Sequence, residues 1–135
     1  MFRYLITKGG NISSYLISLL LTLPIILLSL SVHEASHAWM ANKLGDPTAR
    51  NLGRLTLNPF KHLDLVGFIC MLLFGFGWAN PVPVNSRYFK KPRRDMALTA
   101  AAGPLSNIVL GFIFVSLYEI SYLLTVRLFP SVAAS

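Results

Sequence analysis

Two histidines and a glutamate stand together in the run His33-Glu34-Ala35-Ser36-His37. Residues four apart on a helix lie on the same face, so the two imidazoles can converge on one ion. Zinc accepts imidazole nitrogen and, in catalytic sites, keeps a position open for water. Glu34 is not a ligand at this spacing, but it lies beside the metal, where its carboxylate can take a proton from zinc-bound water. The run therefore matches the zinc-peptidase motif His-Glu-x-x-His.

The location of this motif favours a functional interpretation. It directly follows Leu16–Ser31, a run dominated by Leu, Ile and Ser that with its flanks is long enough to cross a bilayer. An acidic or basic side chain at the centre of such a span costs ~2.5–3.5 kcal/mol on insertion scales. We therefore interpret His33 and His37 as zinc ligands and Glu34 as the general base. The alternative is a structural membrane protein in which the histidines are incidental.

The composition of the 135 residues is not that of a soluble domain. Hydrophobic residues make up 54% and charged residues 13% of the sequence, against ~25% charged residues in soluble proteins. The basic residues behind the net charge of +7 lie beside apolar spans, so we expect contact with the headgroups of a lipid bilayer and no nucleic acid partner. Cys70 is the only cysteine, which excludes an intrachain disulfide and a cysteine-based metal site.

Two long apolar stretches predict an all-α membrane protein, a helical transmembrane bundle in a single domain of residues 1–135. We expect spans at about residues 12–42 and 95–124, each long enough to cross the hydrocarbon core. Residues 63–84 lie between them and combine a short apolar run with Trp78–Val84. Two prolines at alternate positions prevent a helix in Trp78–Val84 and suit an extended edge strand.

The distribution of charge predicts how residues 63–84 meet the membrane. Nine of the twelve Lys and Arg residues lie between Lys43 and Arg94. A full crossing by the short apolar run Leu63–Gly77 would put the basic loops 43–62 and 85–95 on opposite sides, which the positive-inside rule disfavours. We therefore expect a re-entrant helix and β segment, with a short full span as the alternative. Both loops are then expected on the cytoplasmic side of a multi-pass protein of the cell (inner) membrane.

The histidine motif is the first of an ordered set of short runs that together cover about residues 14–115. The others are Gly45-Asp46-Pro47, Asn58-Pro59, His62-Leu63-Asp64, Gly77-Trp78-Ala79-Asn80-Pro81-Val82-Pro83-Val84-Asn85 and Gly103-Pro104-Leu105-Ser106-Asn107. As a set, these runs resemble the site-2 protease family of intramembrane zinc metalloproteases. The resemblance implies that the protein hydrolyses peptide bonds within transmembrane segments of substrate proteins.

The resemblance also implies roles for residues outside the histidine motif. In that family, a re-entrant β segment near the active site is thought to receive the substrate as an added strand. The matching segment here implies substrate contacts from Trp78, Val82 and Val84. The helix that carries Gly-Pro-x-x-Asn packs against the metal helix, and Asn107 would donate a hydrogen bond to the substrate backbone or to the developing oxyanion. A hydrogen bond between helices is the alternative role for Asn107.

One family feature does not occur in this sequence. The third zinc ligand of the family is an aspartate in a later helix, and no matching motif follows Asn107. We therefore expect either a fragment of a longer protein or a chain without a complete site. Asp64 and Asp95 are the internal substitutes to consider, although Asp64 also suits a turn or helix cap. The alternative function is accordingly a truncated or catalytically inactive homologue that binds transmembrane partners without cleaving them.

Overall fold

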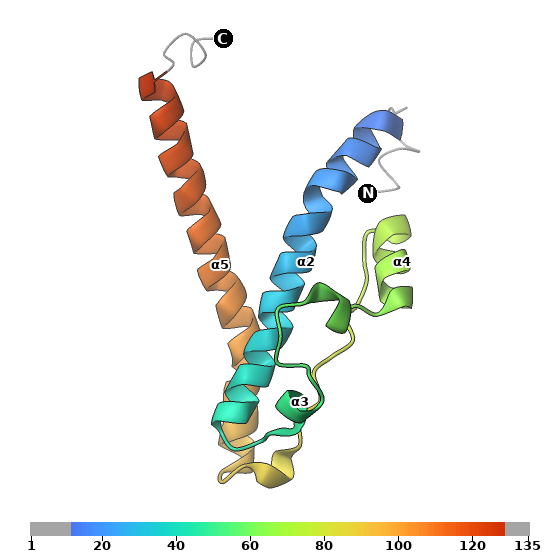
Figure 1. Cartoon of the computed structure of the whole chain (residues 1–135), viewed down its shortest axis with the longest axis vertical. Coiled ribbons are helices and arrows are strands. Elements are labelled where there is room, and N and C mark those ends of the chain that lie inside the picture. Colours follow the sequence, from blue (N-terminus) through green and yellow to red (C-terminus); the bar gives the residue numbers. More distant parts are fainter. Residues whose placement is uncertain (1–11, 129–135) are drawn as a thin grey trace.

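The computed structural model describes residues 12–128, so both ends of the expected 1–135 domain lie outside the described residues. Two long helices carry the fold and four short helices connect them (Figure 1). The elements are α2 (Ile12–Lys43), α3 (Thr48–Asn51), η1 (Pro59–Lys61), α4 (Leu65–Phe74), η2 (Ser86–Tyr88) and α5 (Pro92–Leu128). No strand occurs between residues 12 and 128. The predicted all-α class is confirmed.

The helices α2 and α5 run in opposite directions and cross where α2 ends and α5 begins (Figure 1). Small side chains fill this end of the molecule, and the buried apolar residues include Ala38, Ala41 and Ala102. Small residues let two membrane helices approach closely. Away from the crossing the two helices separate, and their large apolar side chains are exposed.

The exposure of these apolar side chains indicates a membrane protein. Within the most apolar window of each long helix, 6% of the α2 window and none of the α5 window is buried. The core helix of a soluble protein would bury its apolar side chains against other elements. Here the apolar surface surrounds both helices, which suits contact with lipid.

The bounds of the second long helix differ from those expected. α5 begins at Pro92, three residues before the expected start, and ends at Leu128. Proline suits the first turn of a helix because its missing N–H would have no helical partner there. Asp95 lies within this first turn, and its Oδ2 accepts a hydrogen bond from the Lys91 N–H at 3.0 Å. The Asp95 carboxylate therefore reaches back from within the first turn to the backbone N–H of Lys91, the residue before the helix.

The connection between the long helices contains a short helix and a returning chain. α4 has ten residues, or about 15 Å of helix, which is half the ~30 Å hydrocarbon core. Asp64 caps it, because Oδ1 accepts a hydrogen bond from the Gly67 N–H at 2.7 Å. After α4 the chain returns alongside it, so closely that a Cβ on Gly67 would overlap the backbone of Trp78.

The expected strand at Trp78–Val84 is an extended segment without a ladder of hydrogen bonds. It pairs at an isolated antiparallel bridge between Leu63 and Ala79, where the Asn80 N–H donates to the His62 carbonyl at 2.8 Å. Pro81 and Pro83 have no N–H to extend the pairing. The prediction of a β-strand at Trp78–Val84 is therefore wrong, although the segment is extended.

The turn after α2 is fixed to the far end of this segment by the carboxylate of Asp46. The side chain is fully buried and accepts hydrogen bonds from Thr48 N at 2.9 Å, from Thr48 Oγ1 and from Asn85 N at 2.6 Å. Burial alone would raise the pKa of Asp46, but the hydrogen bonds from Thr48 and Asn85 outweigh it and lower the pKa below its ordinary value.

We expect Asp46→Ala to destabilise the protein. The substitution leaves three part-buried donors without their acceptor, and an unsatisfied donor that is fully buried costs about 1–3 kcal/mol. The measurement is thermal unfolding in detergent, with Asp64→Ala as a control that removes only the cap of α4.

The loss should also depend on pH. Because the folded pKa is lowered, the stabilisation is present above the unfolded value of ~3.9 and disappears as the pH falls through the folded value. The difference between wild type and Asp46→Ala should therefore be full near pH 7 and shrink below about pH 4. A difference that stays constant with pH would contradict this role of the carboxylate.

Candidate functional site

The site lies where α2 and α5 cross, and it takes side chains from one face of each helix. His33 and His37 are one turn apart on α2. They face Thr99, Gly103 and Asn107, which follow one another at steps of four on α5. Because the helices are antiparallel, His37 meets the earlier residue of this row and His33 the later one.

Gly103 allows the helices to meet directly at the two imidazoles. A Cβ at this position would lie 2.7 Å from His33 Nε2 and still closer to His37 Nε2, which is nearer than real Cβ atoms approach. Any other residue would therefore push α5 away from the histidines or displace their rings. The sequence places its smallest residue at the point of closest contact.

The hydrogen bond of His37 determines where its proton resides. Nδ1 lies 2.7 Å from the backbone carbonyl of Thr99. A carbonyl only accepts, so Nδ1 carries the proton and donates it, and Nε2 is left with a lone pair. This Nε2 lies 3.0 Å from His33 Nε2. Ligand histidines commonly have this arrangement, in which one nitrogen is held by a carbonyl and the other is presented to a metal.

Asn107 has the corresponding position beside His33. Its Nδ2 lies 3.2 Å from His33 Nδ1, while its Oδ1 is buried without a hydrogen-bond partner. In this orientation the amide donates to Nδ1, and His33 Nε2–H donates to His37 Nε2. A half-turn of the amide would place Oδ1 against Nδ1 instead. Nδ1 would then donate, both Nε2 lone pairs would face one point, and the orphaned oxygen would have a partner.

These two histidines fit a zinc ion as part of its ligand set. Tetrahedral zinc with Zn–N bonds of ~2.0–2.1 Å requires the two nitrogens to lie about 3.3 Å apart. The observed separation of 3.0 Å is within a few tenths of an ångström of that value. Across residues 12–128, no group of three His, Cys, Asp or Glu side chains converges on a common point. Asp64, considered from the sequence as a further ligand, caps α4 instead.

Glu34 lies beside the histidines and is held by the extended segment. Its side chain is 7% exposed, and Oε2 accepts a hydrogen bond from the Val82 N–H at 3.1 Å. Oε1 has no hydrogen bond to a described residue. The carboxylate is therefore fixed through one oxygen while the other remains available.

Two cavities meet at Glu34. One of about 440 Å³ extends along α2 and is lined by His33, Glu34 and Asn107 together with Ser29 and three apolar residues. The other, of about 220 Å³, is lined by Glu34, His37 and residues from the extended segment and α5. The extended segment contributes Pro81, Val82 and Val84, and α5 contributes Met96, Thr99 and Ala100. The carboxylate and the imidazoles are thus reachable from both sides of the helix crossing.

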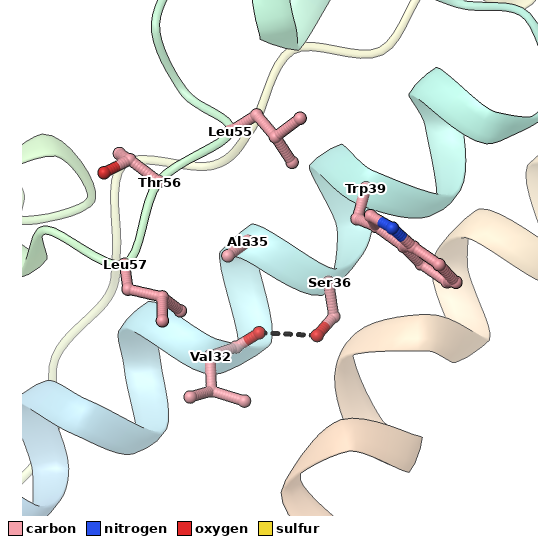
Figure 2. A pocket seen from close by; sticks show the side chains of 7 residues that line it. All are labelled: Val32, Ala35, Ser36, Trp39, Leu55, Thr56 and Leu57. Atoms are coloured by element: carbon pink, nitrogen blue, oxygen red, sulfur yellow. Dashed lines mark hydrogen bonds between the residues drawn. The ribbon is translucent and has the colours of Figure 1, made fainter.

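A third cavity, of about 270 Å³, lies on another face of α2, against Leu55–Leu57 (Figure 2). Trp39 and Ser36 are among its lining residues, and the Ser36 hydroxyl donates to the Val32 carbonyl of its own helix. The lining contains no titratable side chain, so this cavity offers no acid, base or metal ligand.

The structure brings together most of the residues singled out in the sequence. His33, Glu34, His37 and Asn107 line one continuous site, and Val82 and Val84 line the second cavity. Trp78 lines neither of these cavities, and its side chain is 52% exposed. Sequence reasoning missed the Thr99 carbonyl and the Val82 N–H, because backbone groups leave no signature in residue type. The steps of four from Asn107 back to Gly103 and Thr99 were the available signal.

Comparison with known proteins gives two relatives. "Putative zinc metalloprotease YwhC" of Bacillus subtilis is 56% identical over 88 residues, which cover 65% of this chain and 40% of that protein. "Putative zinc metalloprotease Rip2" of Mycolicibacterium smegmatis is 31% identical over 96 residues, which cover 67% of this chain and 37% of that protein. The chain thus spans about two fifths of the length of the curated relatives it matches. No protein-family model and no solved structure matches the sequence.

The two relatives agree with the ordered sequence runs from which the resemblance was drawn. Both carry names of the enzyme class that the histidine motif and its context indicated. On these grounds, the chain belongs to the site-2-protease-like family of zinc metalloproteases.

Proposed function

We propose that the protein is an intramembrane zinc metalloprotease that hydrolyses peptide bonds in transmembrane segments of substrate proteins. The observation that carries this proposal is the convergence of His33, Glu34, His37 and Asn107 where two lipid-exposed helices cross. Ionisable groups at membrane depth are costly and mark functional sites. The names of the two relatives support the same enzyme class.

In this proposal, Nε2 of His33 and Nε2 of His37 would hold a zinc ion. Bound zinc would supply Lewis-acid polarisation of the scissile carbonyl and of the attacking water. The Thr99 carbonyl and the Asn107 amide orient the two rings. Two imidazoles would leave a bound zinc ion short of the three protein ligands usual in catalytic sites, so at least one further ligand would be needed.

Glu34 acts as the general base. The Val82 N–H holds Oε2, and Oε1 accepts the proton of the attacking water and returns it to the leaving amine. The carboxylate lines both cavities, so a water or peptide that enters either one can reach it.

The substrate enters as an extended chain beside Val82 and Val84. Both residues line the cavity that Glu34 and His37 share, so a peptide there lies within reach of the base. Asn107 lines the larger cavity beside His33 and Glu34, and in this proposal it donates a hydrogen bond to the substrate backbone or to the developing oxyanion. Contact of the substrate with Trp78, outside these cavities, stays a prediction.

We further propose that α4 and the returning chain enter the membrane and leave on the same side. α4 is too short to cross, and its return path lies against it. The basic loops 43–62 and 85–95 then share the cytoplasmic side of the inner membrane. The Asp46 hydrogen bond to Asn85, which joins these two loops, supports this arrangement.

Zinc binding tests the ligand assignment. We expect His33→Ala and His37→Ala to lower the zinc affinity of the purified native protein by at least about 100-fold, since changes beyond the ligands alone cost 10–100-fold. Zinc content after dialysis against a graded chelator is the measurement. His62→Gln is the matched control, because Nε2 of this third histidine bonds the Thr56 carbonyl away from the site. Equal loss in all three variants would contradict the assignment.

Cleavage of a model transmembrane substrate tests the enzyme assignment. In detergent or proteoliposomes, the complete native protein should cleave the substrate, and Glu34→Gln should lower the rate by about 100–10,000-fold, which is the usual contribution of a general base. Zinc content should remain near that of wild type because Glu34 is not a ligand. If wild type and Glu34→Gln show no difference, the protease proposal fails and the non-cleaving homologue that binds transmembrane partners becomes the better description.

A further inference from the structure

One peptide group lies between two oppositely charged side chains near the site. The peptide joins Pro81 to Val82, and its N–H donates to Glu34 Oε2 at 3.1 Å. The carbonyl oxygen of the same peptide accepts a hydrogen bond from Arg54 Nη2 at 3.3 Å. In a trans peptide the oxygen and the hydrogen point in opposite directions. The guanidinium and the carboxylate therefore hold the two ends of one peptide dipole.

The side-chain hydrogen bonds of Arg54 all go to backbone carbonyls of the extended segment. Its Nη2 also donates to the carbonyl of Asn80, so the guanidinium contacts two successive carbonyls of the extended segment. Its own backbone is tied to α3, because the Arg54 N–H donates to the Ala49 carbonyl at 2.8 Å. Within residues 12–128 Arg54 forms no ion pair, and its Nε is buried without a partner. The Arg54 guanidinium thus bonds two backbone carbonyl oxygens and no carboxylate of a described residue.

The extended segment needs such a support because it has little regular pairing. Besides the two carbonyls held by Arg54, its backbone pairing consists of the bridge at Ala79, the Asn80 N–H bond to His62 and the Val82 N–H bond to Glu34. A segment without a ladder would leave the Val82 N–H free to move. Hydrogen bonds in series polarise one another, so the guanidinium also strengthens the bond that the N–H makes to Glu34.

We propose that Arg54 is a positioning residue for Glu34, acting through the Pro81–Val82 peptide. The role of Glu34 as a base rests on the proposed function, but the mechanical coupling does not. Arg54 contacts neither the histidines nor the cavities described above. It fixes the plane of one peptide, and that peptide fixes the orientation of the carboxylate.

Amide hydrogen exchange in the complete native protein tests the coupling without requiring activity. Arg54→Gln should raise the exchange rate of the Val82 N–H by at least about tenfold, because the peptide loses the hydrogen bond at its oxygen and becomes mobile. Arg54→Lys should restore part of the protection. Arg50→Gln, in the neighbouring helix α3, removes an equal charge and should leave the exchange rate of the Val82 N–H unchanged.

Kinetics test the consequence for catalysis. Arg54→Gln should lower kcat by about 10–100-fold with KM nearly unchanged, the cost of a misplaced catalytic group, and zinc content should stay at the wild-type level. Val82→Pro removes the N–H and should lower kcat similarly, and the double variant should be little worse than either single one. Val82→Ala keeps the N–H and should lose much less.

The outcomes separate this inference from the proposed function. Unchanged Val82 exchange in Arg54→Gln, or fully additive losses in the double variant, would overturn the positioning role. A wild-type protein without Glu34-dependent cleavage would instead overturn the protease proposal, while altered exchange in Arg54→Gln would still support the coupling of Arg54 to Glu34.

Discussion

Two partly buried imidazoles lie between lipid-exposed helices, where their ring nitrogens need hydrogen-bond partners. The Thr99 carbonyl meets one outer nitrogen and the Asn107 amide meets the other, while the two inner nitrogens face each other. These contacts recur every four residues along α5, so they fix both its rotation and its register against α2. A shift of α5 by one residue would turn Thr99, Gly103 and Asn107 away from the two histidines. The packing of the two long helices is thus specified by polar contacts within a largely apolar pair.

The same contacts explain why the crossing is built from small residues. Gly103 lies where a Cβ would overlap both imidazoles, and neighbouring buried positions include Ala38, Ala41 and Ala102. Large apolar side chains would hold the helices too far apart for the carbonyl of one to reach the ring of the other. Farther along, the helices diverge and carry large exposed side chains. The close packing of the two helices is therefore what allows the hydrogen bonds to the imidazoles to form.

Site features made by side chains could be predicted from the sequence, whereas those made by backbone groups could not. The spacing of His33 and His37 and the apolar run before them indicated the site directly, since both follow from helical periodicity. The Val82 N–H and the Thr99 carbonyl could not be predicted, because any residue type carries such a group. Trp78–Val84 was expected to be a strand from its prolines and extended pattern, but a ladder needs N–H groups that those prolines lack. The roles of Asp46 and Arg54 depend on contacts 39 and 26 or 27 residues away in sequence, which local patterns do not encode.

The use of the extended segment as a support limits how it could also receive a substrate. Of the backbone donors in residues 80–84, Asn80 and Val82 already bond His62 and Glu34, and two prolines have none. Val84 is the remaining N–H donor. A substrate strand added there would have to donate its own N–H groups to the carbonyls of this segment, and only an unwound substrate has them free. On the proposed function, recognition would therefore rest on the unwinding of the substrate helix and on side-chain fit beside Val82 and Val84, since a full ladder of hydrogen bonds cannot form.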